Sequence, residues 1–384
     1  MSATEMANHK LQLLDTTLNV QTVPLAAKTV FYIPAFLQDA NRHGGKRRSE
    51  QLAEALLESS NHIRIFRYKT FSFSPYWFCV LGKRSFVYWT ARRLSLRGAL
   101  GYLLYGMALA KELTRLKPQA VVVETAPRLT MLYADIVRKL RIPYCLVPHN
   151  IEFMVPGKHD STFASNFAVY AWEATLFQSA KKVLPISSLD ETVLKCLGAN
   201  TAPFSYFPTQ ATYQQFQQIA DKRQQFQAQN HSRFVLILGS AANAPNRRGI
   251  KSLLEYIKSS AALKSKHFKV AGHFTEQFAN YRADNIDIAG TLDEETLHKL
   301  LIECEFVLLR QPQTTGFMTR LVELNLCGIP VVLLGSYVQA ESLADFGIKY
   351  LDSEKPSIED LLSPIPVLQK FTKPLLPDLE MGLT

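Results

Sequence analysis

Two segments in the later half of the chain combine residue types and spacings that favour the binding of a phosphate. In the first, residues 314–334, Gly316 and Phe317 lead into a helical pattern that ends at Gly328. Backbone amides at such a helix start point outward and, together with the helix dipole, attract an anion. Glu323, one to two turns further along, is placed to accept hydrogen bonds from both vicinal hydroxyls of a ribose. The alternative is an ordinary turn between strand and helix, with Glu323 as a solvated helix residue.

The second segment places two arginines where a helix begins. Gly239 ends an apolar run and allows close approach to the backbone, and Arg247 and Arg248 precede Gly249 at the start of the next helical pattern. Positive charge in a first helical turn is unfavourable against the helix dipole unless an anion is bound. A planar guanidinium can hold two phosphate oxygens at once. The alternative is a solvent-exposed basic turn, but the unfavourable placement favours a ligand.

The elements that must position these residues alternate between strand and helix. Apolar runs separated by amphipathic stretches are typical of a parallel sheet covered by helices on both faces. In such sheets, ligands bind beyond the carboxyl ends of the strands. The predicted strands are residues 29–34, 63–68, 120–124, 144–148, 183–186 and 204–207, then 233–238, 269–271, 286–289, 306–309 and 329–334. The predicted helices are residues 49–57, 129–140, 167–180 and 189–197, then 250–259, 294–303, 319–326 and 338–346.

A change of composition divides the chain. Residues 209–232 contain nine glutamines and no long apolar run, which indicates a partly helical linker. We therefore predict a lead-in over residues 1–27, a first Rossmann-like domain over residues 28–208, and a second one over residues 233–384. The predicted fold class is α/β, with two doubly wound parallel-sheet domains that face each other across a cleft.

The first segment resembles the signature of family-4-type glycosyltransferases with the GT-B fold, which runs roughly EGFGxPxxEAxAxGxPVV. The stretch TGFMTRLVELNLCGIPVV keeps the Gly-Phe pair, the second glutamate and the Gly-x-Pro-Val-Val close. The resemblance implies that Glu323 binds the nucleotide ribose. Thr315 stands where the family has a glutamate at the donor sugar. Arg320 replaces the family's proline, and a basic residue there would suit a diphosphate.

The stretch FVLILGSAANAPNRRGIKSLLEYI resembles the first strand, loop and helix of the same family's C-terminal domain. The resemblance implies that Arg248, and after it Arg247, pair with the donor diphosphate, although Ser240 stands where the family has another arginine. The stretch IDIAGTLDEETLHKLLIECEFVLL resembles a family segment whose early loop abuts the nucleotide base. Gly290 and Thr291 are therefore expected to lie beside the base.

The earlier half resembles the family in shorter motifs. Gly44 and Gly45 match a glycine pair close to the donor phosphates and the acceptor, and they suit a tight turn around an anion. RIPYCLVPHNIEF resembles xxPxxxxxHNxE, which implies that His149 lies near the donor sugar or the acceptor. The alternative is a neutral histidine satisfied by the backbone. Glu152 is the nearest carboxylate that could act as a base, and Glu124 ends the adjacent predicted strand.

Residues 59–111 include nine Lys or Arg, many aromatic side chains and no acidic residue. Cations attract anionic headgroups and aromatic rings favour the headgroup boundary, so we predict that residues 64–97 meet an anionic membrane surface. The alternative is a solvated basic face with a few core aromatics. The longest apolar run, residues 98–110, is too short to span a bilayer, and no secretion signal is recognisable. The expected location is the cytoplasm, peripheral to the inner face of the plasma membrane.

The resemblance implies an enzyme of the hexosyltransferase type, which moves a sugar from a nucleotide-diphosphate sugar to a hydroxyl of a lipid-linked acceptor or glycan precursor. It implies retention of the anomeric configuration, while inversion with His149 or Glu152 as base stays open. No DxD, CxxC or HExxH spacing occurs, and neither a metal nor a cofactor is expected. Thr315 supports one alternative, a non-catalytic GT-B relative that binds a nucleotide or serves as a scaffold. A nicotinamide enzyme is disfavoured because no GxGxxG follows a strand, and no nucleic-acid partner is expected.

Overall fold

A computed structural model describes residues 29–37, 44–59, 63–66, 75–79, 81, 96–125, 130–154, 163–229, 234–242, 244–310, 317–335, 343–351 and 356–377 of the chain. The described residues form two compact units that divide after Thr209. Phe317 and residues 374–377, although later in the chain, also belong to the first unit. The predicted lead-in, residues 1–27, lies outside the described residues.

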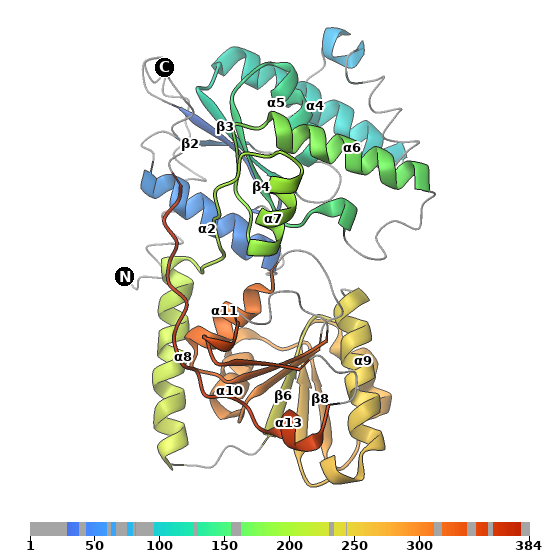
Figure 1. Cartoon of the computed structure of the whole chain (residues 1–384), viewed down its shortest axis with the longest axis vertical. Helices are drawn as coiled ribbons and strands as arrows, with labels where there is room; N and C mark the ends of the chain where they lie inside the picture. The colour runs from blue at the N-terminus through green and yellow to red at the C-terminus, as the bar shows by residue number, and fades with distance from the viewer. Residues whose placement is uncertain are drawn as a thin grey trace. The chain divides into compact units, whose positions relative to one another are not determined.

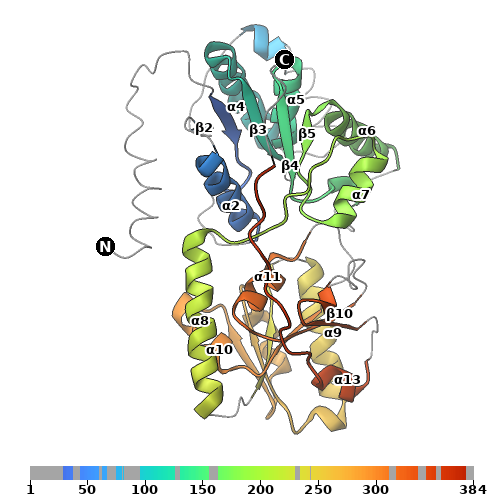
Figure 2. The same ribbon diagram turned by 60° about the vertical axis from the view of Figure 1, so that its left-hand side comes forward.

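The first unit contains a five-stranded sheet in which every pairing is parallel. The strand order is β2-β1-β3-β4-β5, with β1 (Val30–Ile33), β2 (Ile63–Ile65), β3 (Ala120–Thr125), β4 (Tyr144–Pro148) and β5 (Lys182–Val183). Helices lie on both faces of this sheet (Figures 1 and 2). They are α2 (Gly44–Ser59), α4 (Leu96–Leu116), α5 (Thr130–Lys139), α6 (Phe163–Ser179) and α7 (Ser188–Cys196), with the short helix η1 (Glu152–Met154) after β4.

Alternation along the strands of the first unit builds two buried layers. Val121 and Val123 of β3 join a core with α4, α5 and α6, whereas Val122 points to the opposite face and packs with Leu52 and Leu56 of α2. Every residue of β3 is buried, which is the behaviour of a central parallel strand. The layers explain why continuous apolar runs in the sequence predict these strands.

The second unit contains a six-stranded sheet that is also parallel throughout. Its order is β11-β10-β9-β6-β7-β8, with β6 (Phe234–Leu238), β7 (His267–Ala271), β8 (Ile286–Gly290), β9 (Val307–Arg310), β10 (Val331–Leu334) and β11 (Ile348–Leu351). The helices are α8 (Gln210–Gln229), α9 (Ala244–Ser259), α10 (Glu294–Glu303), α11 (Thr319–Leu326) and α13 (Ile358–Leu362), with the short helices η2 (Ala261–Leu263) and η3 (Thr275–Tyr281). Both units thus have the predicted doubly wound parallel sheet. The predicted cleft between them stays a prediction.

The glutamine-rich stretch predicted as a linker forms α8, a helix of the second unit that packs against α10 and α11 (Figure 2). Phe216, Ile219 and Arg223 recur at helical spacing and are buried. The Arg223 guanidinium donates to the Leu301 carbonyl at 3.1 Å, near the end of α10. Burial lowers the pKa of Arg223, and its contact with the Cys304 thiol opposes that shift. These three buried side chains hold α8 against the second unit.

Residues 204–207, predicted as a strand, belong to neither a strand nor a helix. The Phe204 N–H donates to the Pro185 carbonyl at 3.0 Å, and the carbonyls of Phe204 and Ser205 accept hydrogen bonds from the buried Arg48 of α2. A buried guanidinium therefore replaces a neighbouring strand. Among the described residues, no helix has the combination of length and apolarity that a membrane span requires.

Candidate functional site

Each sheet has a point at which the strand order reverses. In the first unit, the chain places β2 on one side of β1 and β3 on the other; in the second, β7 lies on one side of β6 and β9 on the other. Connections then leave the carboxyl ends of the two central strands in opposite directions, and ligands of doubly wound sheets bind there. Ligands are therefore expected at the carboxyl ends of β1 and β3 in the first unit, and at those of β6 and β9 in the second.

Glu124, near the end of β3, is the centre of a buried polar cluster in the first unit. Its carboxylate accepts hydrogen bonds from the Ala35 N–H at 2.8 Å and from the Tyr32 and Ser49 hydroxyls, and it contacts His149 Nε2 at 3.1 Å. These partners come from β1, the loop after β1, α2, and the residue following β4. The cluster therefore bridges β1 and β3 at the carboxyl edge of the sheet.

The Glu124 carboxylate is fully buried, yet its pKa is lowered. Burial alone would raise the pKa, but hydrogen bonds from His149, Ser49 and Tyr32, together with the electrostatic interaction with His149, outweigh it. Burial also lowers the pKa of the neighbouring Arg48 to about 10, although the charge of Glu124 opposes that shift. The pair of Glu124 and His149 is thus a charged carboxylate beside an imidazole.

His149 and Glu152 lie on one loop that the rest of the unit holds in place. The His149 N–H donates to the Thr125 carbonyl at 3.0 Å, and Phe36 meets the imidazole edge-on at 5.1 Å between ring centroids. Only 8% of the His149 side chain is exposed, and Glu152 is buried at the start of η1. The two predicted catalytic residues therefore share one loop but have different partners.

Glu173 of α6 is a residue that the sequence analysis missed. Its carboxylate, fully buried, accepts the backbone N–H groups of Glu152 at 2.9 Å and Phe153 at 3.0 Å. This caps η1 and fixes the loop that follows His149. The available signal was that Glu173 is the one charged residue of α6, whose sequence is FASNFAVYAWEATLFQS.

Gly44 and Gly45 form the first turn of α2, five residues before the predicted helix start. Their N–H groups are among those that a helix leaves without an intrahelical partner. The residues that precede them, 38–43, lie outside the described part of the chain.

In the second unit, glycines end the strands β6, β7 and β8 in close succession. Gly272 has φ +133°, and a Cβ there would lie 2.1 Å from the Gly239 carbonyl oxygen, so the two strand ends touch through their backbones. Gly290 has φ +77°. The Thr291 hydroxyl accepts from the Phe274 N–H and contacts the Glu276 carboxylate, each at 3.0 Å. Thr291 therefore ties two strand-end loops together.

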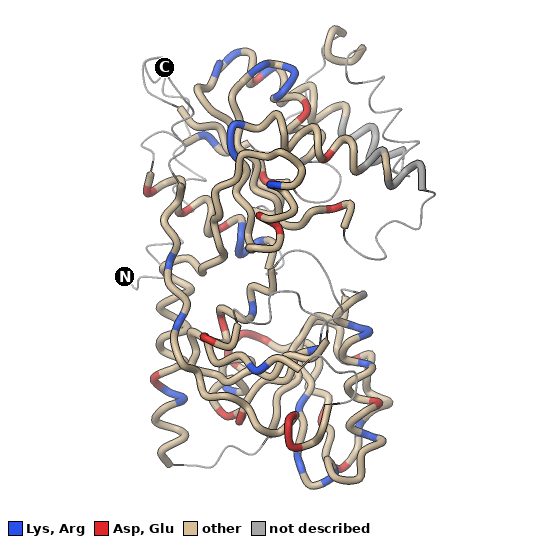
Figure 3. The backbone as a smooth tube through the Cα atoms, in the orientation of Figure 1, with Lys and Arg blue, Asp and Glu red and all other residues tan. Residues whose placement is uncertain are grey.

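Arg247 and Arg248 are exposed in the first turns of α9. Basic residues, blue in Figure 3, recur along this helix. Arg247 Nη1 lies 3.4 Å from the Ala241 carbonyl, at the limit of a hydrogen bond. A Cβ on Gly249 would lie 2.1 Å from the Arg310 carbonyl oxygen, so the backbone at the start of α9 packs directly against the end of β9. The structure thereby adds Arg310, which the sequence analysis did not single out, to the reversal point between β6 and β9.

α11 starts at Thr319 without a capping hydrogen bond from the side chain of Met318. Phe317 comes just before it, Arg320 lies in its first turn, and Glu323, which is 8% exposed, lies in its second. Gly316 and Thr315 are outside the described residues. α11 follows β9 and α9 follows β6, so these helices leave neighbouring strands at the reversal point.

Neither protein-family models nor curated protein sequences give a match to this chain. Solved structures do: sucrose-phosphate synthase from Thermosynechococcus elongatus aligns over 85% of this chain and 86% of its own, at 14% identity and a TM-score of 0.58. Anabaena HepE in complex with UDP-glucose aligns over 84% and 85%, at 14% identity and 0.54. The trehalose-6-phosphate synthase OtsA aligns over 85% and 88%, at 10% identity and 0.54.

The chain has the GT-B fold. Each unit corresponds to one Rossmann-like domain of that fold, as its sheet requires. At 10 to 14% identity, the likeness concerns the fold alone and assigns a role to no residue of this chain.

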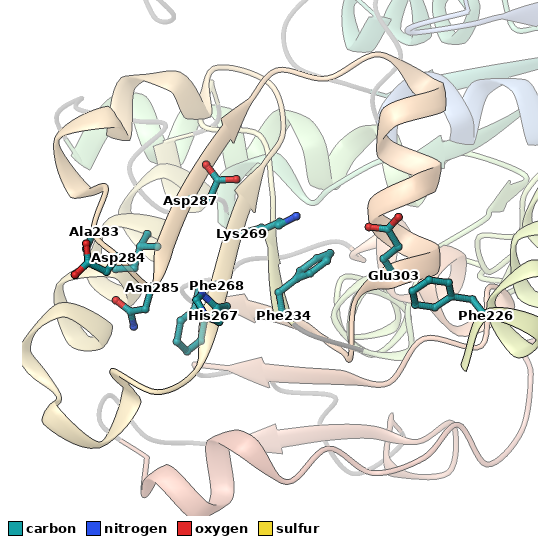
Figure 4. Close-up of a pocket in the computed structure, with 11 residues that line it drawn as sticks. Phe226, Phe234, His267, Phe268, Lys269, Ala283, Asp284, Asn285, Asp287 and Glu303 are labelled. Carbon is teal, nitrogen blue, oxygen red and sulfur yellow. The ribbon is translucent and has the colours of Figure 1, made fainter. Parts of the chain in front are cut away.

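Figure 4 shows a pocket of about 500 Å³ in the second GT-B domain, and neither Arg247, Arg248 nor Glu323 is among the residues that line it. Its walls come from the amino ends of β6, β7 and β8 and include Phe234, Lys269 and Asp287, with the Lys269 ammonium 4.3 Å from the Phe234 ring centroid. This is the edge of the sheet opposite to the strand ends that carry the glycines. Among the described residues, no group of three or more His, Cys, Asp or Glu could hold a metal ion.

Proposed function

We propose that the protein is a glycosyltransferase that moves a sugar from a nucleotide-diphosphate sugar to a hydroxyl acceptor. One observation carries the proposal: in both parallel sheets, residues that can bind phosphate or transfer a proton lie at the point where the strand order reverses. The second unit supplies glycine turns and arginines, which suit a phosphorylated donor. The first supplies a buried carboxylate and an imidazole, which suit an acceptor hydroxyl. Solved structures that share the fold include one with UDP-glucose bound.

The donor site that we propose uses Arg248, Arg247, Arg320 and Glu323 of the second unit. The exposed arginines begin α9, where the helix dipole alone would repel them, so a diphosphate would relieve an unfavourable charge arrangement. The amides at the start of α11 would bind a phosphate, and the Glu323 carboxylate would accept the ribose hydroxyls. Each charge-assisted hydrogen bond contributes roughly 1.5–3 kcal/mol. Positive charge here also stabilises the diphosphate as it departs.

Glycine turns complete this proposed donor site. Gly239 follows β6 and Gly290 ends β8, and a Cβ would lie 3.2 Å from the Ile250 side chain at Gly239 and 3.6 Å from the Glu276 side chain at Gly290. Thr291 follows Gly290, and we place the nucleotide base beside these two residues. Gly316 and Phe317 would lie at the phosphates, and Gly44 and Gly45, at the start of α2, near the donor phosphates and the acceptor.

The acceptor that we propose is lipid-linked or a glycan precursor, presented at an anionic membrane surface. Residues 64–97 would meet that surface. Most of this stretch lies outside the described residues, but Tyr76 and Phe78 are described and are 68% and 46% exposed. Exposed aromatic rings of this kind favour the headgroup region. A cytoplasmic, membrane-peripheral location and a reaction that needs no metal are parts of the same proposal.

Nucleotide binding tests the donor site directly. In a thermal-shift screen with UDP, GDP, ADP and CMP, at least one diphosphate is expected to raise the melting temperature, because a ligand that binds the folded chain stabilises it. Arg248→Ala combined with Glu323→Ala is expected to abolish the shift, while Lys251→Ala, an exposed lysine of the same helix, keeps it. A full shift in the double variant would place the nucleotide elsewhere.

Thr315 favours a second candidate, a GT-B protein that binds a nucleotide but transfers no sugar, because the resemblance places a donor-side glutamate at this position. Incubation with a panel of nucleotide sugars and hydroxyl acceptors distinguishes the two. Saturable nucleotide binding without transfer or hydrolysis would support the non-catalytic candidate, and release of the nucleoside diphosphate would support the transferase.

A further inference from the structure

We infer that Phe274, in the loop between β7 and η3, is a binding residue whose ring stacks on the base of the nucleotide. The inference rests on the proposed function and deepens it. It names the side chain that holds the base, and it requires a nucleoside, not a diphosphate alone, as the ligand of this loop.

The backbone of Phe274 is left-handed, with φ +62° and ψ +18°. Apart from glycines, Lys117 and Arg141 share a positive φ in the described part of the chain. Both closely follow the end of a helix, where a left-handed residue is a common way to terminate it. Phe274 comes shortly after a strand instead, and a bulky residue in this conformation is strained. Strain of this kind concentrates at sites that bind ligands.

Hydrogen bonds hold the loop in this strained conformation. The Phe274 N–H donates to the Thr291 hydroxyl at 3.0 Å, and the Phe274 carbonyl accepts from the Gln277 side-chain amide at 2.7 Å. The next residue, Thr275, is fully buried, and its hydroxyl donates to the Gly272 carbonyl at 2.8 Å. The fold therefore sets the direction in which the Phe274 side chain leaves the backbone.

The ring that this loop presents is largely open. The Phe274 side chain is 49% exposed, and its nearest aromatic neighbour, His273, lies 4.2 Å away between ring centroids but is tilted by 50°. A glycine would adopt the same backbone conformation without strain. Neither the strain nor the exposure stabilises the folded chain, so the combination indicates a role in binding.

The loop lies within the donor site that we propose. The Ala241 N–H, after β6, donates to the His273 carbonyl at 2.8 Å, and Arg247 Nη1 lies 3.4 Å from the Ala241 carbonyl. On the other side, Phe274 is bonded to Thr291, after β8. Backbone contacts thus connect an arginine that we assign to the diphosphate with the residue beside which we place the base. All of these residues belong to the second unit.

The charge next to Phe274 favours a base over a phosphate. The Thr291 hydroxyl accepts from the Phe274 N–H and donates its only proton to the Glu276 carboxylate at 3.0 Å. Glu276 is exposed, and its carboxylate keeps further acceptor positions for an N–H at the edge of a base. The same negative charge would repel a phosphate. An aromatic ring stacks on any nucleobase, because every base has a π-face.

Calorimetric titration of the full chain with UDP, GDP, ADP and inorganic pyrophosphate separates the base from the phosphates. Phe274→Ala is expected to weaken binding of the nucleoside diphosphate that the wild type binds most tightly by about 5- to 100-fold, which is the contribution of one stacked base. Its affinity for pyrophosphate should stay unchanged. Phe226→Ala is the matched control, because it removes a partly buried ring from the amino-end pocket of the same unit, and should alter neither affinity.

Two further variants separate the ring from the backbone strain. Phe274→Gly removes both, so it is expected to bind the nucleotide as weakly as Phe274→Ala while unfolding at a higher urea concentration than that variant. Phe274→Tyr keeps a ring and should keep the affinity. A glycine variant that binds like the wild type would overturn the inference, because the backbone and not the ring would then determine binding.

Phe274→Trp gives a readout that depends on neither affinity nor activity. The natural tryptophans, Trp77, Trp89 and Trp172, all precede the second unit in the sequence. The difference in emission between this variant and the wild type therefore reports on the added indole. The nucleoside diphosphate is expected to quench it by stacking, and pyrophosphate to leave it unchanged. Equal responses to the two ligands would contradict stacking.

The outcomes distinguish the inference from the proposed function. Nucleotide binding that Phe274→Ala leaves unchanged, or that falls together with pyrophosphate binding, refutes the inference alone. Nucleotide binding that depends on the ring, with no sugar transfer from any donor tested, refutes the transferase and leaves the role of Phe274 intact. A wild-type chain that binds none of the nucleotides refutes both.

Discussion

At the residue scale, the chemistry depends on contacts between residues far apart in the sequence. Glu124 is 75 residues from Ser49 and 92 from Tyr32, and each of them bonds its carboxylate. Glu173 holds a backbone segment 20 residues away. None of these pairs has a motif, so the sequence indicated the strand end at Glu124 but not its partners. The resemblance, in contrast, predicts roles for Arg247, Arg248 and Glu323 because their motifs are local, and these roles stay predictions.

Arg310 is the residue-scale prediction. Its backbone lies against Gly249 at the start of α9, beside the arginines that we assign to the diphosphate, and it stands at the end of β9 where the strand order reverses. We expect Arg310→Ala to weaken UDP binding by about tenfold and UMP binding much less, because loss of a charge-assisted hydrogen bond to a phosphate costs roughly 1.5–3 kcal/mol. Calorimetric titration of both nucleotides measures this, with Lys251→Ala as control. Equal losses for UMP and UDP would mean that Arg310 does not act at the outer phosphate.

At the scale of elements, strands buried on both faces were the easiest to predict. The strand at residues 144–148 and the helices at residues 294–303 and 319–326 have the predicted bounds. The residues of α8 were predicted as a linker because only three of its positions are buried and glutamines surround them. β11 was missed because most residues of its short sequence, IKYL, are only partly buried. Residues 204–207 resemble a strand in composition, but the carbonyls of Phe204 and Ser205 accept hydrogen bonds from the buried Arg48. The structure of these segments depends on contacts with residues far away in the sequence, and a local sequence pattern does not reveal such contacts.

The start of α9 gives the element-scale prediction. Alanine normally stabilises a helix by about 1 kcal/mol relative to glycine. At Gly249 a Cβ would lie 2.1 Å from the Arg310 carbonyl oxygen, which is backbone and cannot turn away, so Gly249→Ala must push α9 off β9. We expect a lower free energy of unfolding by about 1–3 kcal/mol and weaker nucleotide binding. Urea unfolding and UDP titration measure the two effects. A variant more stable than the wild type would show that the helix start is not packed as described.

At the scale of the whole molecule, the formal net charge of +10 requires an account that the donor site alone does not give. Four of the basic residues, Lys83, Arg84, Arg92 and Arg93, occur within the stretch that we assign to an anionic membrane surface. Each cation near such a surface contributes about 1 kcal/mol, and salt screens the attraction beyond roughly 10 Å at 0.1 M ionic strength. The whole chain should therefore bind anionic vesicles in a salt-dependent manner.

Vesicle flotation tests whether the position of the charge matters or only its sum. Replacing these four residues by serine is expected to reduce binding to phosphatidylglycerol vesicles by about 100-fold or more, because several kcal/mol of attraction are lost together. Replacing Lys195, Lys222, Lys251 and Lys258, all exposed, by serine lowers the net charge equally and should leave most of the binding intact. Equal losses in the two variants would make net charge the cause and remove residues 64–97 as the membrane surface. Binding to neutral vesicles that salt leaves unchanged would contradict the electrostatic argument itself.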